Sequence, residues 1–258
     1  MILRLISPVI LLLSGMVSLL VSAEKLEIAT EHFPPYNYMA DNIVTGINTE
    51  LVQRSCEIAA IDCSIQSYPW LRAMALTLSN ENSGLYSTSR SVERESQFQW
   101  VGPLANSDTF FFRLKSRPEV KVVNLDDAKK YVVGVARGDV YEAYLQQNGF
   151  SYGENLFGFT TKADAANLFV QGKIDLLIGS WQILPMWLAP YNATVEDVEA
   201  TMQLNAIGAN YLALNLNVPK PIVAKLQQAL QQLRDSGEYQ QIVEKYQHSL
   251  QAEGNKKN

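Results

Sequence analysis

The sequence predicts an α/β protein with mainly parallel sheets, and three observations support that prediction. Strand-like and helix-like segments alternate along most of the chain. The alternation starts again after a Gly-Pro break at Gly102 and Pro103. Two amphipathic helices then close the chain, with apolar stripes over residues 222–233 and 239–250. Hydrophobic residues make up 47% of the sequence, which is enough for a substantial core.

The first half of the chain begins with residues 26–30, where apolar and polar side chains alternate as in a half-buried strand. Paired prolines keep the following loop, residues 31–36, extended. A helix is predicted over residues 49–60, and Pro69 begins another. The remaining predicted strands of this half are residues 63–68, 84–87 and 98–101.

The second half repeats the same alternation of strands and helices. The predicted strands are residues 109–114, 131–135, 174–178 and 211–216. One helix follows Asp139 and ends at Gly149, and another covers residues 164–170. Residues 251–258 form a polar tail in which we expect no ordered structure.

Residues 1–23 have the composition of a signal peptide. Arg4 provides the positive start, residues 5–21 are largely apolar, and Val21-Ser22-Ala23 matches a small-residue cleavage site. A membrane anchor is the alternative, because the apolar run approaches the length of a short spanning helix. The polar start at Glu24 favours export, so we expect a periplasmic protein cleaved after Ala23.

The charge balance excludes one class of partner. Removal of Arg4 with the signal peptide leaves 20 basic and 26 acidic residues, a net charge of −6. An acidic chain without a basic tract is a poor match for nucleic acid. No nucleic-acid partner is therefore expected.

The two cysteines, Cys56 and Cys63, are seven positions apart. In an exported chain such a pair most often forms a disulfide, which here would join the end of a helix to the next strand. A metal site is the weaker alternative, because His32 and His248 are the only histidines and neither is near the cysteines in sequence. We expect a disulfide and no metal.

Arg94 is the strongest candidate for a ligand-binding residue. It follows a short strand that ends in hydroxyl residues, Ser87 and Ser89 among them. Hydroxyl groups, backbone N–H groups and a guanidinium fork together suit a small carboxylate. The alternatives are a surface or helix-capping arginine beside Glu93 and Glu95, or the use of Arg90 in its place.

The segment from Gly84 to Glu95, followed by the aromatic strand that Gly102 and Pro103 close, resembles the family 3 periplasmic solute-binding proteins that serve polar amino acids. The cysteine spacing is similar to that of the histidine-binding and lysine/arginine/ornithine-binding members. The resemblance covers essentially the whole mature chain.

That resemblance implies the two-lobed type II periplasmic binding protein fold. Each lobe would be a mainly parallel sheet flanked by helices, with the ligand cleft between the lobes. Lobe 1 would comprise residues 24–106 and 208–250, and lobe 2 would be inserted as residues 107–207. The protein is expected to be a monomer that closes on its ligand and meets an inner-membrane ABC permease or a sensor.

The resemblance also implies roles for individual residues. Arg94, with Ser87 and Ser89, would bind the ligand carboxylate, while Phe33 and Trp70 would pack on the ligand from opposite sides. The alternative for both aromatic residues is core packing.

Other residues are secondary candidates for ligand binding. Arg72 would suit a dicarboxylate or a large polar ligand, and Asp139 is either a ligand contact or a helix N-cap. Ser180 stands where polar-amino-acid binders usually carry an aspartate that pairs with the ligand ammonium, and Trp181 follows it as a further contact. Glu31 and Asp139 are the two candidate replacements for that missing charge.

A small carboxylate ligand, an amino acid or a related compound, is the function that these residues favour. No P-loop, GxSxG motif or paired zinc ligands occur, so neither a cofactor nor catalysis is expected. The enzymatic alternative is a protein similar to the exported cyclohexadienyl dehydratases, with Glu31 as the acid acting on prephenate or arogenate. A sensor or lytic-transglycosylase input module is a third possibility.

Overall fold

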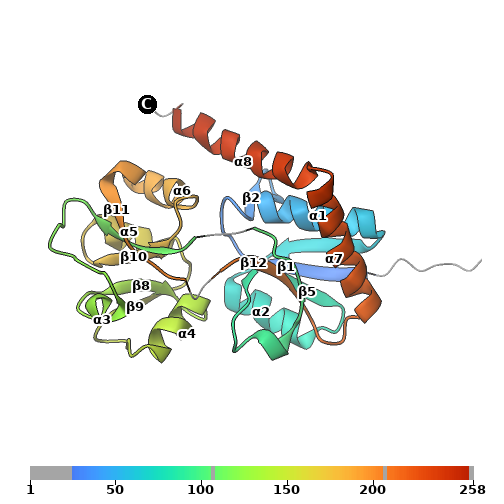
Figure 1. Cartoon of the computed structure of the whole chain (residues 1–258), viewed down its shortest axis with the longest axis horizontal. Coiled ribbons are helices and arrows are strands. Elements are labelled where there is room, and N and C mark those ends of the chain that lie inside the picture. Colours follow the sequence, from blue (N-terminus) through green and yellow to red (C-terminus); the bar gives the residue numbers. More distant parts are fainter. Residues whose placement is uncertain (1–24, 106–107, 206–207, 256–258) are drawn as a thin grey trace, which may run out of the picture.

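The computed structural model describes residues 25–105, 108–205 and 208–255. The predicted signal peptide and the two predicted lobe boundaries, 106/107 and 207/208, fall on residues outside this description. The described chain forms two α/β lobes that lie side by side (Figure 1). Here lobe 1 means residues 25–105 with 208–255, and lobe 2 means residues 108–205.

Lobe 1 is built on a five-stranded sheet in the order β4-β1-β5-β12-β6. Its strands are β1 (Lys25–Thr30), β4 (Asp62–Ser67), β5 (Ser83–Ser89), β6 (Gln99–Val101) and β12 (Asn210–Leu214). A short hairpin of β2 (Tyr38–Ala40) and β3 (Ile43–Thr45) lies outside that sheet. Strand β12 joins this sheet although it follows lobe 2 in sequence, so the chain enters and leaves lobe 2 between β6 and β12.

Lobe 2 has its own five-stranded sheet, in the order β11-β7-β10-β8-β9. Its strands are β7 (Phe110–Leu114), β8 (Val133–Ala136), β9 (Leu156–Phe159), β10 (Leu176–Gly179) and β11 (Val198–Gln203). Its helical segments are α3 (Leu125–Ala128), α4 (Val140–Gln147), α5 (Asp164–Val170), α6 (Leu184–Leu188), η2 (Ala189–Tyr191) and η3 (Val195–Asp197).

The α/β prediction is confirmed, but within the described residues both sheets are more mixed than predicted. In lobe 1, β1 pairs in parallel with β4 and β5, whereas β12 pairs antiparallel with β5 and β6. In lobe 2, β8 pairs in parallel with β9 and β10, whereas β7 pairs antiparallel with β10 and β11. Each antiparallel pair of the two large sheets includes β7 or β12, the first strand after each passage between the lobes.

The helices of lobe 1 cover its sheet and close the structure. They are α1 (Ile47–Ala59), α2 (Trp70–Ser79), the 3₁₀ turn η1 (Glu95–Gln97), α7 (Lys220–Asp235) and α8 (Glu238–Asn255). Helix α7 buries its predicted stripe, including Leu226, Leu230 and Leu233, and packs against α1. The Cys56–Cys63 disulfide links α1 to β4 with a Cα–Cα distance of 6.2 Å, as the sequence predicts.

Helix α8 continues to Asn255, so the prediction of an unordered tail from residue 251 was wrong for residues 251–255. Those residues include Gln251, Ala252 and Glu253, which are good helix formers, and no proline interrupts them. Within the described residues, no helix is long and apolar enough to span a membrane, and no group of three or more metal-binding side chains is present.

Candidate functional site

The candidate site lies between the lobes, at the ends of parallel strands. Glu31 directly follows β1, and Arg94 lies in the turn after β5, both in lobe 1. Asp139 lies three residues beyond the end of β8, and Lys162 lies three residues beyond the end of β9, both in lobe 2. The carboxyl ends of strands in α/β sheets are where ligands usually bind, because loops and helix N-termini converge there.

Arg94 is held between the lobes by backbone oxygens and an aromatic ring. Its Nη1 donates to the carbonyl of Ser89 at 3.4 Å, and its Nη2 donates to the carbonyl of Gly138 in lobe 2 at 3.2 Å. The guanidinium lies 5.2 Å from the ring centroid of Trp70, within the range of a cation–π contact. Burial lowers the pKa of Arg94, while Asp139 and Glu31 act in the opposite direction.

Arg90 does not compete with Arg94 for this position. Its guanidinium pairs with Glu95 at 2.5 Å and lies over the rings of Trp100 and Tyr211. Arg90 is exposed, whereas Arg94 is partly buried. The surface ion pair that sequence reasoning considered for Arg94 is therefore made by Arg90.

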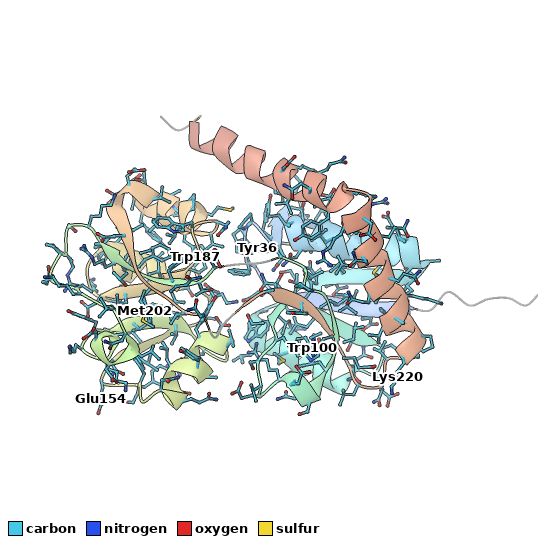
Figure 2. All side chains as sticks on the ribbon, viewed as in Figure 1. Tyr36, Trp100, Glu154, Trp187, Met202 and Lys220 are labelled. Carbon is cyan, nitrogen blue, oxygen red and sulfur yellow. A yellow bond between two sulfur atoms is a disulfide. The ribbon has the colours of Figure 1, made fainter. Side chains whose placement is uncertain are left out.

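Trp70 and Phe33 form the apolar side of the cleft. Trp70 is 5% exposed and its indole N–H donates to the carbonyl of Gly138 at 2.8 Å, so it contacts both lobes. The ring of Phe33 lies between Tyr36, at 5.2 Å, and Trp187 of lobe 2, at 6.3 Å between centroids. Figure 2 shows Tyr36 and Trp187 at the facing edges of the two lobes.

Lys162 is the residue that sequence reasoning missed. Its ammonium group lies 2.8 Å from Oε1 of Glu31 and 3.7 Å from Oδ2 of Asp139. It also lies 4.3 Å from the ring centroid of Phe33 and 5.6 Å from that of Trp70. Only 11% of the Lys162 side chain is exposed to water, but two carboxylates and two aromatic rings stabilise its positive charge.

Glu31, Arg94, Asp139 and Lys162 form a charged cluster between the lobes. Burial and the charges of its members determine its protonation. Burial acts to lower the pKa of Lys162, but the charges of Asp139 and Glu31 outweigh it, and the pKa is raised. Burial raises the pKa of Glu31, while Lys162 opposes that shift by stabilising the carboxylate. Lys162 is therefore an ammonium group at neutral pH.

Asp139 is the N-cap of helix α4, and its role as a ligand contact stays a prediction. Its Oδ1 accepts the backbone N–H of Val140 at 2.6 Å and so caps helix α4. Its Oδ2 is buried, accepts no hydrogen bond within the described residues and faces Lys162 at 3.7 Å. One carboxylate thus positions a helix and places its second oxygen in the cluster.

Ser87 and Ser89, at the end of β5, bond to neighbouring protein groups, and their predicted contact with a ligand stays a prediction. The Ser87 hydroxyl donates to Asn37 Oδ1 and accepts from Asn48 Nδ2 at 2.9 Å. Ser89 contributes its backbone carbonyl to Arg94. These contacts join the end of β5 to the loop after β1 and to the start of α1.

Three predicted residues are not joined to the cluster by a described contact. Arg72 is exposed and stacks on Tyr68, with 4.9 Å from its guanidinium carbon to the ring centroid. Trp181 is 43% exposed and packs edge-on against Phe112 at 4.8 Å. Ser180 is 1% exposed, and its hydroxyl has no hydrogen-bond partner within the described residues.

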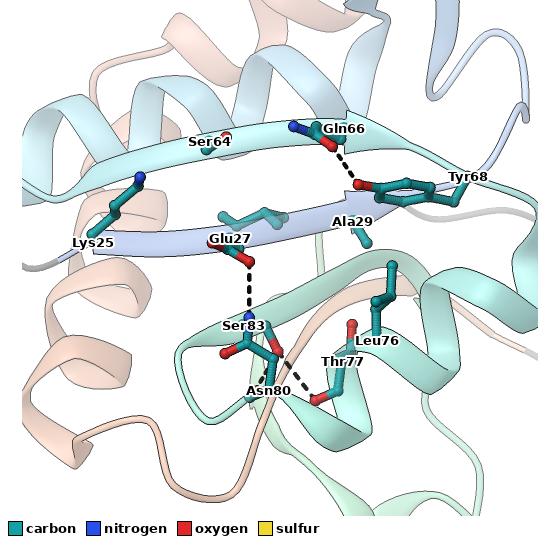
Figure 3. Close-up of a pocket in the computed structure, with 11 residues that line it drawn as sticks. Lys25, Glu27, Ala29, Ser64, Gln66, Tyr68, Leu76, Thr77, Asn80 and Ser83 are labelled. Carbon is teal, nitrogen blue, oxygen red and sulfur yellow. Dashed lines mark hydrogen bonds between the residues drawn. The ribbon is translucent and has the colours of Figure 1, made fainter.

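A separate pocket of about 260 Å³ lies between the β4–β1 edge and α2 in lobe 1 (Figure 3). Its polar groups bond to one another: Asn80 Nδ2 donates to Glu27, and the Tyr68 hydroxyl donates to Gln66. The pocket includes Tyr68, on which Arg72 stacks, but none of the cluster residues. It is therefore distinct from the site between the lobes.

Residues 26–249 match the sequence model of the bacterial extracellular solute-binding proteins, family 3. The chain belongs to this family. No curated protein sequence matches the chain significantly.

Solved structures with the same fold agree with this assignment. A histidine kinase sensor domain with similarity to periplasmic binding proteins has a TM-score of 0.76 at 21% identity, over 87% of this chain and 96% of that domain. An ancestral arginine-binding protein bound to arginine has a TM-score of 0.74 at 17% identity, with coverages of 86% and 98%. The arginine-, lysine-, histidine-binding protein ArtJ of Geobacillus stearothermophilus has a TM-score of 0.72 at 19% identity, with coverages of 86% and 94%. At these identities the likeness establishes the two-lobed fold of this solute-binding protein.

Lys162 could have been predicted as a site residue only if the strand that precedes it had been recognised in the sequence. Residues 156–159 form β9, a short strand with Gly158 in its middle that sequence reasoning did not predict. Without that strand, Lys162 has no reason to lie at the carboxyl edge of a sheet. Its pairing with Glu31, 131 positions away in sequence, is a tertiary contact that no local pattern indicates.

Proposed function

We propose that this chain is a periplasmic solute-binding protein that captures a small carboxylate ligand, an amino acid or a related compound, between its lobes. The observation that carries the proposal is the position of Arg94. Within the described residues its guanidinium has no carboxylate partner and bonds only to two carbonyl oxygens, one from each lobe. A partly buried guanidinium of this kind suits a ligand carboxylate, which it can bind through two parallel hydrogen bonds.

We also propose that the closed protein is delivered to a membrane partner. The structural relatives include a histidine kinase sensor domain and an amino acid ABC transporter substrate-binding protein from Streptococcus pneumoniae bound to L-arginine. These relatives support two partners for the closed form, an inner-membrane sensor or an ABC permease. We propose that the protein acts as a monomer, exported after cleavage following Ala23.

The environment of Glu31 supports binding rather than dehydratase chemistry. A general acid must lie within hydrogen-bond reach of the group that it protonates. Burial raises the pKa of Glu31, but its Oε1 accepts a hydrogen bond from the Lys162 ammonium at 2.8 Å, so this oxygen bonds to the protein itself. Incubation of the protein with prephenate or arogenate should therefore release no aromatic product.

The proposal is tested by substituting Arg94. In a thermal-shift screen of amino acids and other small carboxylates, a ligand at a hundredfold excess over its Kd should add about 2.7 kcal/mol of stability. Arg94→Ala should abolish the shift, because losing one partner of a partly buried charged contact costs about 2–5 kcal/mol of binding. Circular dichroism should show an unchanged fold.

Arg90→Ala is the matched control for this experiment. It removes an arginine four positions away whose charge is already paired with Glu95 on the surface. Ligand affinity should be unchanged in this variant. Retained affinity in Arg94→Ala, or equal loss in both variants, would contradict the proposal.

A further inference from the structure

The cleft already contains an ammonium group of its own. Lys162 extends from the loop between β9 and α5 in lobe 2, and its ammonium pairs with Glu31 in lobe 1 at 2.8 Å. Phe33 and Trp70, also in lobe 1, place their rings 4.3 Å and 5.6 Å from it. Carboxylates and aromatic faces are the groups that bind organic cations. The protein thus builds a cation site between its lobes and fills that site with a lysine.

Both carboxylates of this cluster already face a cation of the protein. Glu31 pairs with Lys162 at 2.8 Å, and Oδ2 of Asp139 lies 3.7 Å from the same ammonium. A ligand carboxylate can bind Arg94, whose described partners are carbonyl oxygens and a ring. A ligand ammonium would instead meet two carboxylates that already face Lys162. Placing two cations side by side in a buried site is strongly unfavourable.

A neutral polar group of a ligand would find a hydrogen-bond partner in this cluster, at Asp139. Oδ2 of Asp139 is buried, lies 3.7 Å from the Lys162 ammonium and accepts no hydrogen bond within the described residues. A ligand hydroxyl can donate to such an oxygen without adding charge. An unsatisfied buried acceptor favours a ligand that supplies a donor.

We propose that Lys162 is the specificity-determining residue of this site. Its ammonium occupies the place that a ligand cation would take, so the cleft selects small organic acids that carry no ammonium group, such as 2-hydroxy acids, over α-amino acids and cationic ligands. This inference rests on the proposed carboxylate-binding function and narrows its ligand class. The preference arises by exclusion, since the resident charge penalises the competing ligand.

Matched ligand pairs test the inference by isothermal titration calorimetry. The pairs are L-lactate with L-alanine, L-2-hydroxyglutarate with L-glutamate, and L-phenyllactate with L-phenylalanine, together with L-arginine and L-lysine. Each pair exchanges a hydroxyl for an ammonium at the same carbon. The wild-type protein should bind the hydroxy acid of at least one pair more than about tenfold more tightly than the amino acid.

Lys162→Met removes the resident charge while keeping most of the side-chain length. It should reduce or reverse the preference by about tenfold or more, because Glu31 and Asp139 then lack a cation. Lys162→Gln should behave in the same way and serves if the methionine variant folds poorly. Lys121→Met is the control, since Lys121 is an exposed lysine of the same lobe, and it should leave every affinity unchanged.

The outcomes separate this inference from the proposed function. If the wild type binds an amino acid at least as tightly as its hydroxy acid, and Arg94→Ala abolishes that binding, the carboxylate function stands and the role of Lys162 is overturned. An unchanged preference in both Lys162 variants also overturns it. If no carboxylate in the panel binds any variant, the proposed function fails and the inference fails with it.

Discussion

The two faces of the cleft are built differently. Lobe 1 contains a polar network that needs no group of lobe 2: Ser87 bonds Asn37 and Asn48, and Asn37 Nδ2 donates to the carbonyl of Glu31 at 2.6 Å. The lobe 2 groups bond mainly across the gap, because the carbonyl of Gly138 accepts from Trp70 and Arg94 of lobe 1 and Lys162 pairs with Glu31. Part of the lobe 1 face is therefore held in place by its own lobe, whereas the bonds of Gly138 and Lys162 depend on contact between the lobes.

This difference indicates an order of events in ligand capture. A face whose donors and acceptors are already arranged loses little entropy when a ligand docks on it. A face whose polar groups bond mainly across the gap gains those bonds only when the lobes close. We therefore expect lobe 1 to receive the carboxylate and lobe 2 to complete the closed state.

The comparison predicts opposite results for two buried serines. Ser87→Ala should reduce the free energy of unfolding by about 1–3 kcal/mol, because two buried asparagine groups lose their partner. Ser180→Ala should change it by less than about 0.5 kcal/mol or raise it, since that hydroxyl makes no hydrogen bond within the described residues. Urea denaturation of the ligand-free proteins measures both, and equal costs would refute the contrast between the lobes.

Gly138 allows the close approach of the two lobes. It has a φ of +74°, and an added Cβ would lie 2.2 Å from Cδ2 of Leu71 in lobe 1. Gly138→Ala should weaken ligand binding by about two- to threefold and leave the radius of gyration of the ligand-bound protein nearly unchanged, because the 58% exposed side chain of Leu71 can turn aside when the lobes meet. Calorimetry and small-angle X-ray scattering provide the two measurements.

Gly153→Ala is the control for the backbone strain in that variant. Gly153 has a φ of +86°, but an added Cβ would meet nothing within 4 Å. Both alanine variants therefore carry a similar left-handed strain of about 1 kcal/mol. Weakened binding in both would mean that strain within lobe 2, and not contact between the lobes, determines affinity.

The smallest predicted effect is a pH dependence of the ion pair between the lobes. The pKa of Lys162 is raised because Asp139 and Glu31 outweigh burial. Its contribution to stability is therefore fully present below the unfolded pKa of about 10.4 and is lost as the pH rises through the folded value. Urea denaturation of wild type and Lys162→Met should give a difference in the free energy of unfolding that is constant from about pH 7 to about pH 10 and then decreases. If this difference already decreased between about pH 7 and pH 9, burial would outweigh the two carboxylates in setting the pKa of Lys162.

Several elements could be predicted because their signals are local. Proline at position 69 directly precedes α2, and the apolar stripe of α7 is buried as its spacing requires. The Arg94 segment was recognisable for the same reason, since its hydroxyl residues and arginine are within eight positions of one another. Short strands such as β9 and β11 were missed because four to six residues carry little periodic signal.

The sequence by itself determined the α/β class, the amphipathic helices and the disulfide between Cys56 and Cys63, because these depend on neighbours in the chain. The tertiary structure alone decided which charges meet. Glu31 and Lys162 are 131 positions apart, and Trp70 and Gly138 are 68 apart, yet each pair forms a bond across the cleft. Contacts of this kind follow from the order of strands in two separate sheets, and that order is set by the packing of the whole chain.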